Sequence, residues 1–216
     1  LPVFLIIGIF GSGNKVFSTI KVTIYTMAGS LFMFVAILYL GVAFFNEYGH
    51  WSFQYNDLTT LTHLSYNEKL FLFLAFVTAF MIKIPLFPFH TWITATYSDA
   101  PTGGVFLLSS IMAKLGVYAV VRFMIPIFPD IFVQFSDWFV FIGIFGMIYF
   151  GIAALMQDDI KKMFAYSSAS HLSLIAAGVF SLNSYGINGA LYLVIAHAIA
   201  TGGLFLLIGL LHDQTG

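Results

Sequence analysis

Long apolar stretches, separated by short polar connections, run along the whole chain. After an opening stretch at 1–10, they cover residues 23–45, 68–97, 102–123, 135–156, 162–181 and 187–211. A helix needs about 20 apolar residues to cross ~30 Å of hydrocarbon, so the opening stretch is too short and each later one is long enough. The pattern predicts an all-α, polytopic integral membrane protein, a single transmembrane domain over 1–216 with six full spans and one partial span.

Composition supports the assignment to a membrane. The chain is 60% hydrophobic and 8% charged, with a mean hydropathy of +0.97, whereas soluble domains are about 25% charged. The net charge is −1 and the charges lie between the apolar stretches, which excludes the basic surface that nucleic acid requires. The chain has no cysteine, so disulfides, thiolate-bound iron–sulfur clusters and covalent c-type haem are excluded. We therefore expect it to bind no metal or cofactor.

The basic residues predict an orientation in the membrane. In the six-span arrangement one side carries Lys15, Lys21, Lys161 and Lys162, and the other carries only Lys69 and Arg122. Loops on the cytoplasmic side hold the excess of lysine and arginine. The first side is therefore predicted to face the cytoplasm or matrix.

Lys83 lies inside an apolar span and is followed closely by two prolines. A charge near the middle of a membrane helix costs about 2.5–3.5 kcal/mol even on the lenient insertion scale. Pro85 and Pro88 lack the amide hydrogens that would bind the carbonyls of Met81 and Ile84. The pattern predicts a helix broken around Lys83 to Pro88, a polar pocket beside the lysine, and carbonyls satisfied by water or neighbouring helices. The alternative is a proline kink with Lys83 extending to the membrane surface.

Lys114 lies near the middle of its own span. Ser110 and Tyr118 precede and follow it by four residues, which places all three on one face of a regular helix. Because neither membrane surface is within easy reach, we interpret Lys114 as a buried functional lysine. Removal from water disfavours the charged form of an amine, so such a lysine is suited to exchanging protons.

Two histidines lie at mid-span in consecutive helices. His171 follows the hydroxyls of Ser167 and Ser170, and His197 precedes Thr201 by one turn. Imidazole carries a donor and an acceptor on opposite nitrogens and titrates near neutral pH, which suits a proton relay. The alternatives are hydrogen-bonded packing residues and, for the pair, axial ligands of a b-type haem.

Together these residues predict a row of titratable groups that runs along the membrane plane. Lys83, Lys114, His171 and His197 place one such group on each of four helices. Packed helix axes lie ~8–10 Å apart, so water and nearby hydroxyls must bridge between them. The bridging hydroxyls are expected from Ser110, Tyr118, Ser167, Ser170 and Thr201. The alternative is a structural scaffold, in which leucine or methionine would replace the lysines without loss.

Several strings of residues stand out along the chain. They are Lys-Ile-Pro-Leu-Phe-Pro-Phe-His-Thr-Trp at 83–92, Ala-Pro-Thr-Gly-Gly at 100–104 followed by Lys114, Asp-Ile-Lys-Lys at 159–162, Ala-Tyr-Ser-Ser at 165–168 with Ser-His at 170–171, and Ile-Ala-His at 195–197. These strings resemble the antiporter-like subunits of respiratory complex I, and their order and spacing are most similar to the chain-M type, the mitochondrial subunit-four type. One departure follows Trp92. The family usually reads Leu-Pro-Asp-Ala-His there, and this chain has Ile-Thr-Ala-Thr-Tyr at 93–97.

The resemblance implies an architecture of two inverted repeats, each with a broken helix. It implies that Lys83 is the central proton-carrying lysine of the first repeat and Lys114 a bridging lysine. His171 and His197 match connecting positions, and His90, Pro85 and Pro88 support the break. The family's partner glutamate would precede Leu1 and its terminal ionisable residue would follow Gly216, so we expect the chain to be an internal piece of a longer protein.

The function that the resemblance implies is proton translocation in the membrane arm of a complex-I-like NADH:quinone oxidoreductase. NADH, FMN, iron–sulfur clusters and quinone would be bound by other subunits. The implied partners are other membrane-arm subunits, protons and the lipid of a bacterial plasma membrane, a mitochondrial inner membrane or another energy-transducing membrane. The alternatives are a subunit of an Mrp-type cation/proton antiporter or of a membrane-bound hydrogenase.

Overall fold

A computed structural model describes residues 2–215, apart from the side chains at 212, 213 and 215. Helices form nearly all of the regular structure in this range. The elements follow the order α1 (Pro2–Phe10), α2 (Lys15–Tyr48), α3 (Tyr55–Leu58), α4 (Tyr66–Lys83), α5 (Thr91–Asp99), α6 (Thr102–Leu107), η1 (Leu108–Met112), α7 (Ala113–Ala119), η2 (Val120–Met124), α8 (Ile125–Ile127), α9 (Pro129–Leu155), α10 (Ile160–Phe180) and α11 (Ser184–Thr215). The elements η1 and η2 are π-helical turns within an otherwise α-helical segment.

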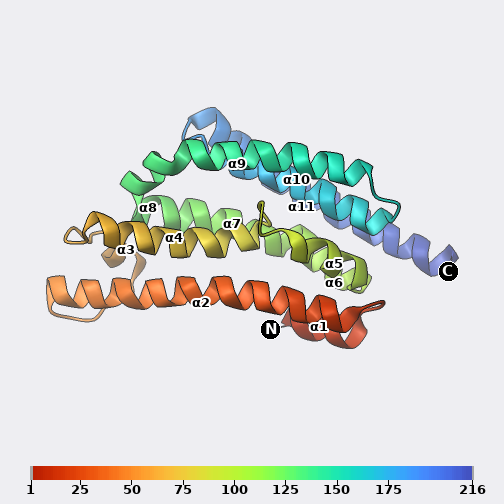
Figure 1. The fold of residues 1–216 in the computed structure, drawn as a ribbon, viewed down its shortest axis with the longest axis horizontal. Helices are drawn as coiled ribbons and strands as arrows, with labels where there is room; N and C mark the ends of the chain where they lie inside the picture. The colour runs from red at the N-terminus through yellow and green to blue at the C-terminus, as the bar shows by residue number, and fades with distance from the viewer. Residues whose placement is uncertain (1, 216) are drawn as a thin grey trace.

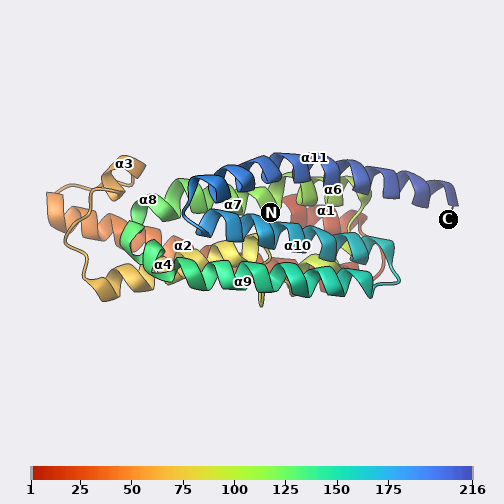
Figure 2. The same ribbon diagram turned by 90° about the horizontal axis from the view of Figure 1, so that it is seen from above.

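The long helices lie side by side and run along one common axis (Figure 1). In this view α1 and α2 form a lower tier, the segments from α4 to α8 a middle tier, and α9, α10 and α11 an upper tier; Figure 2 shows the same bundle from above. The closest packing joins α10 to α9 and to α11, and α2 to α4. The short α1 reaches only from the middle of the bundle to one end.

Five of the described helical segments are long and apolar enough to cross a membrane. They are Lys15–Tyr48, Thr102–Ile127, Pro129–Leu155, Ile160–Phe180 and Ser184–Leu211. The prediction of an all-α, polytopic membrane bundle is confirmed. The first of these helices begins at Lys15, eight residues before the stretch that the apolar pattern delimits from Thr23. Its first turns contain Ser18, Thr19 and Lys21, polar residues that end a hydropathy stretch without ending a helix.

Local chemistry accounts for several helix ends. Ser65 and Glu68 form a reciprocal capping box at the start of α4, and the Asp159 carboxylate accepts from the amides of Lys161 and Lys162 at the start of α10. Gly49 ends α2 in the left-handed region, at φ 77°, where a residue without Cβ carries no steric penalty.

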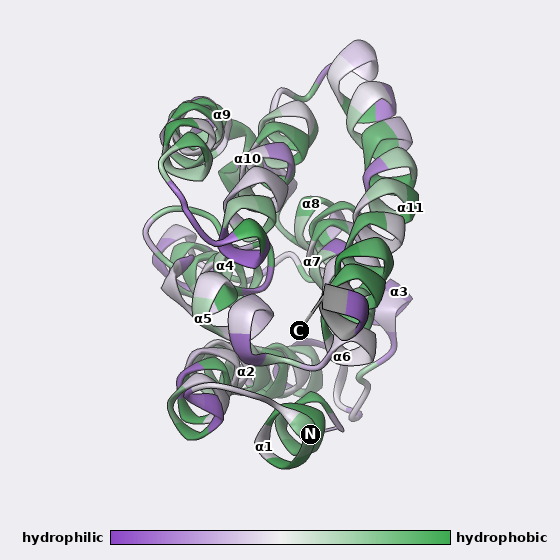
Figure 3. Ribbon diagram, turned by 90° about the vertical axis from the view of Figure 1, so that its right-hand side faces the viewer, coloured by the Kyte–Doolittle hydropathy of each residue, from purple (hydrophilic) through white to green (hydrophobic). Residues whose placement is uncertain are grey.

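The loops at 11–14, 100–101 and 156–159 meet at one end of the bundle, which we call the lysine-rich end because Lys15, Lys21, Lys161 and Lys162 lie there. The Ser12 amide donates to the Asp99 carbonyl at 2.8 Å, and the Ser98 hydroxyl donates to Asp159 at 3.2 Å. Figure 3 views the bundle from this end, with hydrophilic loops toward the viewer and mostly hydrophobic helices behind.

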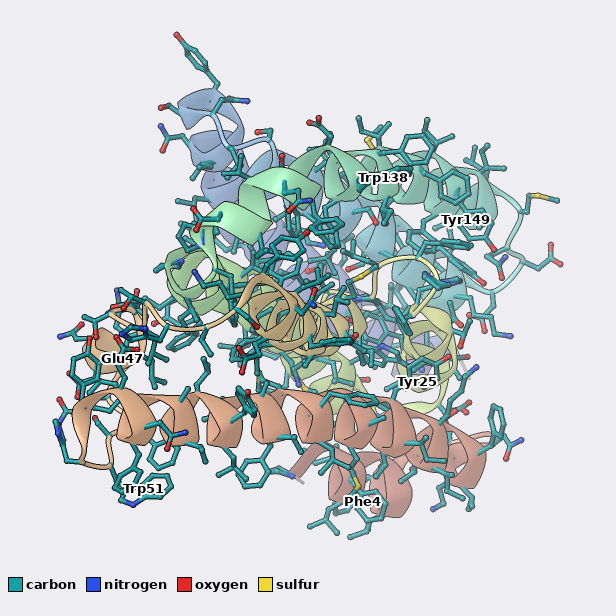
Figure 4. All side chains as sticks on the ribbon, turned by 60° about the vertical axis from the view of Figure 1, so that its left-hand side comes forward. Phe4, Tyr25, Glu47, Trp51, Trp138 and Tyr149 are labelled. Carbon is teal, nitrogen blue, oxygen red and sulfur yellow. The ribbon has the colours of Figure 1, made fainter. Side chains whose placement is uncertain are left out.

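The opposite end carries Lys69 and Arg122, as the charge pattern predicts. The Arg122 guanidinium lies 4.4 Å from the centre of the Tyr55 ring, and Lys69 lies in the first turn of α4. Figure 4 shows Glu47 and Trp51 at this end of α2. Aromatic residues of the connection gather here, consistent with the headgroup region of a membrane.

An aromatic core holds the middle and upper tiers together. Phe73 on α4 contacts the rings of Phe128 and Phe132 edge to face, and Phe132 stacks on Phe180 of α10 at 4.9 Å between ring centres. These side chains are almost completely buried, so they fix α4 against α9 and α10.

Candidate functional site

The helix that carries Lys83 is broken where the prolines predict. α4 ends at Lys83 and α5 begins at Thr91. The Met81 carbonyl, which we expected to bind water or a neighbouring helix, instead accepts from the Leu86 amide of the same segment at 2.9 Å. The indole nitrogen of Trp92 donates to the Ile82 carbonyl at 3.0 Å. The break therefore satisfies these two carbonyls from its own residues, because the chain turns back on α4 directly after Pro85.

Lys83 is half-buried and faces a cavity of about 590 Å³ between α1, α2 and η1. The hydroxyl-bearing residues of this cavity are Thr23, Thr26 and Ser30 of α2. Within the described residues, the Lys83 amine forms no hydrogen bond or ion pair. A pocket therefore lies beside the lysine, but most of its lining is apolar, and α2 supplies its hydroxyls.

Lys114 lies at the start of α7, with a π-helical turn on each side of that helix. Its amine donates to the Ser109 carbonyl of η1, and the residue is 7% exposed. Ser110 instead donates to the Phe106 carbonyl at 2.5 Å, and Tyr118 is 57% exposed and meets Phe123 edge to face. Ser110 lies within the π-helical turn that precedes Lys114, and Tyr118 lies one regular turn after it with its side chain exposed, so neither hydroxyl joins the amine.

The two lysine-bearing segments are in direct contact through a glycine. A Cβ added at Gly116 would lie 2.7 Å from Cγ1 of Ile84 and 3.2 Å from Cβ of Lys83. The first distance is shorter than side-chain contacts in native proteins, and the second is tighter than most of them. α7 therefore packs its backbone against the break, two residues after Lys114.

The two histidines meet between α10 and α11. The ring centres of His171 and His197 lie 5.1 Å apart, and Nε2 of His197 lies 3.1 Å from Oγ of Ser168. His197 is buried and lies within electrostatic range of Lys114, whereas His171 is exposed on this side of α10. The Thr201 hydroxyl donates to the His197 carbonyl at 2.6 Å, so it stabilises the helix and does not reach the ring.

Ser168 is a site residue that the sequence interpretation omitted in favour of its neighbours. Ser170 donates to the Met147 carbonyl of α9 at 2.7 Å, on another side of α10, and Ser167 is partly buried. The spacing in the sequence could have identified Ser168, because Ser168 and His171 are three residues apart and share the helix face that packs on α11. The Ser109 carbonyl was also not foreseeable, since it depends on the π-helical turn.

His90 lies at the start of α5 inside an aromatic cage. It is 6% exposed, stacks on Phe87 at 5.9 Å between ring centres, and lies 4.7 Å from Phe150 of α9. Its Nδ1 atom is buried without a partner among the described residues. Tyr149, labelled on α9 in Figure 4, closes a further side of the cage at 5.7 Å. Among the same residues, no group of three or more metal-ligating side chains comes together.

Comparison with known proteins gives one consistent result. The transmembrane family described as NADH:quinone oxidoreductase/Mrp antiporter matches residues 1–216. The chain is 35% identical to NADH-quinone oxidoreductase subunit M of Rickettsia prowazekii and 36% identical to NADH-ubiquinone oxidoreductase chain 4 of Chondrus crispus, in each case over 99% of this chain. It spans 43% and 42% of the length of these two relatives.

Solved structures agree with the sequence comparison. A chain of respiratory complex I from Thermus thermophilus, in a structure with bound NADH, superposes with a TM-score of 0.90 at 34% identity, covering 100% of this chain and 45% of that one. A chain of the membrane-bound sulfane sulfur reductase, an archaeal respiratory membrane complex, superposes with a TM-score of 0.84 at 26% identity, covering 99% of this chain and 36% of that one.

Proposed function

Because the chain belongs to the NADH:quinone oxidoreductase/Mrp antiporter transmembrane family, we propose that it serves as a proton-carrying part of a complex-I-like membrane arm. The observation that carries the proposal is the burial of both Lys114 and His197 inside the helix bundle. Ionisable residues inside a membrane bundle are expensive, and they are retained where ions or protons pass. A purely structural role would not explain why ionisable side chains lie at these two buried positions.

The proposed relay passes from Lys83 through Lys114 to His197 and His171. Gly116 brings the two lysine-bearing segments into contact, and Ser168 orients the His197 ring. Two unit charges ~10 Å apart interact by about 1.7 kcal/mol at an effective dielectric of 20, enough to move a protonation equilibrium by about tenfold. A change of charge at one member therefore favours proton release or uptake at the next.

The wider setting follows from the relatives. As part of the proposal, other membrane-arm subunits and the lipid bilayer surround this chain, and NADH, FMN, iron–sulfur clusters and quinone belong to other subunits. Residues 1–216 form one transmembrane domain with six crossings, and α4 and α5 together supply the crossing expected from the apolar stretch at 68–97. The lysine-rich end faces the cytoplasm or matrix, and the host membrane is a bacterial plasma membrane, a mitochondrial inner membrane or another energy-transducing membrane.

A cation/proton antiporter or a membrane-bound hydrogenase subunit is the second candidate. The superposition on the sulfane sulfur reductase chain favours it, since the same helical module occurs in another kind of respiratory complex. The two candidates differ in the ions that they transport. An antiporter exchanges protons for sodium or another cation from the opposite side of the membrane.

Haem ligation by the two histidines is not favoured by their geometry. The rings of His171 and His197 pack at 5.1 Å between centres, which leaves no slot for a flat porphyrin between them, and Nε2 of His197 is engaged by Ser168. The purified protein is accordingly expected to lack a Soret band.

Inverted membrane vesicles that contain the full-length subunit in its complex provide the test. We expect NADH to acidify the vesicle lumen, and Lys114→Met to weaken the acidification while NADH oxidation with an artificial electron acceptor continues. Acidification that requires sodium in the wild type indicates the antiporter candidate. Unchanged acidification in Lys114→Met contradicts the proposed function.

A further inference from the structure

A polar cavity of about 590 Å³ lies at the end of the bundle opposite the lysine-rich end, between α2, α4 and the connection that joins them. Its polar side chains are those of Tyr39, Asn46, Glu47, His63 and Glu68. Figure 4 labels Glu47 and Trp51 at this end of α2. The cavity therefore lies where the aromatic residues indicate the headgroup region of the membrane.

Two carboxylates in this cavity are held in place by hydrogen bonds. Glu68 accepts from the Ser65 amide at 2.8 Å and from the Tyr39 hydroxyl. Glu47 accepts from the Thr62 hydroxyl at 2.8 Å. Among the described residues neither carboxylate forms an ion pair. Neutral donors thus fix both carboxylates and leave their negative charges uncompensated, so the cavity is complementary to a cation that can donate hydrogen bonds.

The same cavity also carries side chains that can donate to an anion. The Asn46 amide nitrogen and the His63 ring form no hydrogen bond among the described residues. Both groups can donate, and phosphate oxygens are strong acceptors. The cavity therefore matches a headgroup that carries a positive and a negative charge close together.

An apolar groove continues from the cavity along the same two helices. Tyr39 lines both, and the other side chains of the groove are those of Leu31, Phe32, Val35, Ala36, Phe71, Leu72 and Ala75. The groove has a volume of about 370 Å³. From Tyr39 to Leu31 the helix rises about 12 Å at 1.5 Å per residue, and one leaflet of hydrocarbon is about 15 Å deep. The groove therefore has the depth that an acyl chain occupies.

We propose that the cavity and the groove together bind one phospholipid with a primary ammonium in its headgroup, phosphatidylethanolamine. The ammonium donates to Glu47 and Glu68, the phosphate accepts from Asn46 and His63, and an acyl chain lies along the groove. A primary ammonium has three N–H donors, whereas the quaternary ammonium of phosphatidylcholine has none, so the site selects the ethanolamine lipid. The inference goes beyond the proposed function, because lipid binding at this end does not depend on proton transfer.

Photolabelling of the assembled complex tests the proposal. The complex is reconstituted in phosphatidylcholine bilayers that contain a trace of one of the two lipids with a photoactivatable diazirine in an acyl chain, and labelled peptides are identified by mass spectrometry. We expect peptides containing residues 31–39 and 71–75 to be labelled severalfold more by the ethanolamine lipid than by the choline lipid. Glu47→Gln with Glu68→Gln keeps the side-chain shape and removes both charges, and it should abolish this preference. Glutamine also serves in a capping box, so the start of α4 is retained.

Asp57→Asn with Asp130→Asn is the matched control. It removes the same charge at the same end of the bundle, at residues outside the cavity lining, and the preference should remain. Equal labelling of the wild type by the two lipids, or an unchanged preference in the glutamine pair, overturns the proposal. Absence of label from both peptides also overturns it, because another part of the full-length chain or another subunit then covers the groove. Lipid labelling does not report proton transport, so these outcomes leave the proposed function to its own test.

Discussion

Nε2 of His197 on α11 lies 3.1 Å from Oγ of Ser168 on α10. This contact joins two helices at the point where the buried imidazole also lies within electrostatic range of Lys114. A ring held by a hydroxyl has a fixed orientation and one defined nitrogen engaged. Ser168 thus belongs to the site as a residue that positions His197.

Ser168→Ala should both destabilise the protein and impair the relay. Its removal leaves a buried imidazole nitrogen without a partner, at a cost of about 1–3 kcal/mol in unfolding free energy. Unfolding of the purified protein in detergent measures the first effect, and vesicle acidification the second. Ser170→Ala, which removes a hydroxyl bound to the Met147 carbonyl, is the control and should leave acidification unchanged. Equal acidification by the two variants would show that Ser168 has a packing role only.

Gly116→Ala should disturb the contact between the two lysine-bearing segments. The new methyl would meet Ile84 at 2.7 Å and Lys83 at 3.2 Å, and overpacking of this kind costs about 1–3 kcal/mol. We expect lower thermal stability together with weaker proton translocation, because the break at Lys83 must move. Gly103→Ala is the control, since nothing lies within 4 Å of its added Cβ. Wild-type translocation in Gly116→Ala would mean that the spacing of these segments is not critical.

Gly13→Ala tests how the loop at 11–14 is held against α5. Gly13 has φ of +59°, and an added Cβ would lie 2.7 Å from Oδ1 of Asp99. The left-handed conformation alone costs a non-glycine residue about 1–2 kcal/mol. Gly49→Ala, at φ +77° with nothing within 4 Å, measures that backbone contribution alone. Gly13→Ala should lower the midpoint of thermal unfolding further than Gly49→Ala does, and equal shifts would show that Asp99 moves aside freely.

The sequence predicted those features that depend on local chemistry. Pro85 and Pro88 lack the amide hydrogens of a continuous helix, so the break follows from covalent structure. The helix cap at Asp159 and the long apolar helices likewise depend only on residues that are close in the sequence.

Features that depend on packing were not predictable in this way. The π-helical turn before Lys114 changes the side-chain register of Ser110, and Tyr118, one regular turn after the lysine on α7, has an exposed side chain. The choice of Ser168 over Ser167 and Ser170 follows from how α10 rotates between α9 and α11, which is a tertiary property. The satisfaction of the Met81 carbonyl by Leu86 likewise depends on the path of the chain after the break.

The ratio of protons translocated to electrons transferred tests the central claim, that Lys83 and Lys114 carry protons. It should be measured in vesicles containing the whole complex with Lys83→Met, Lys114→Met or Lys162→Met, the last removing a surface lysine 4.0 Å from Asp159. We predict a lower ratio for Lys83→Met and for Lys114→Met, and a wild-type ratio for Lys162→Met. A wild-type ratio in both Lys83→Met and Lys114→Met would contradict the account.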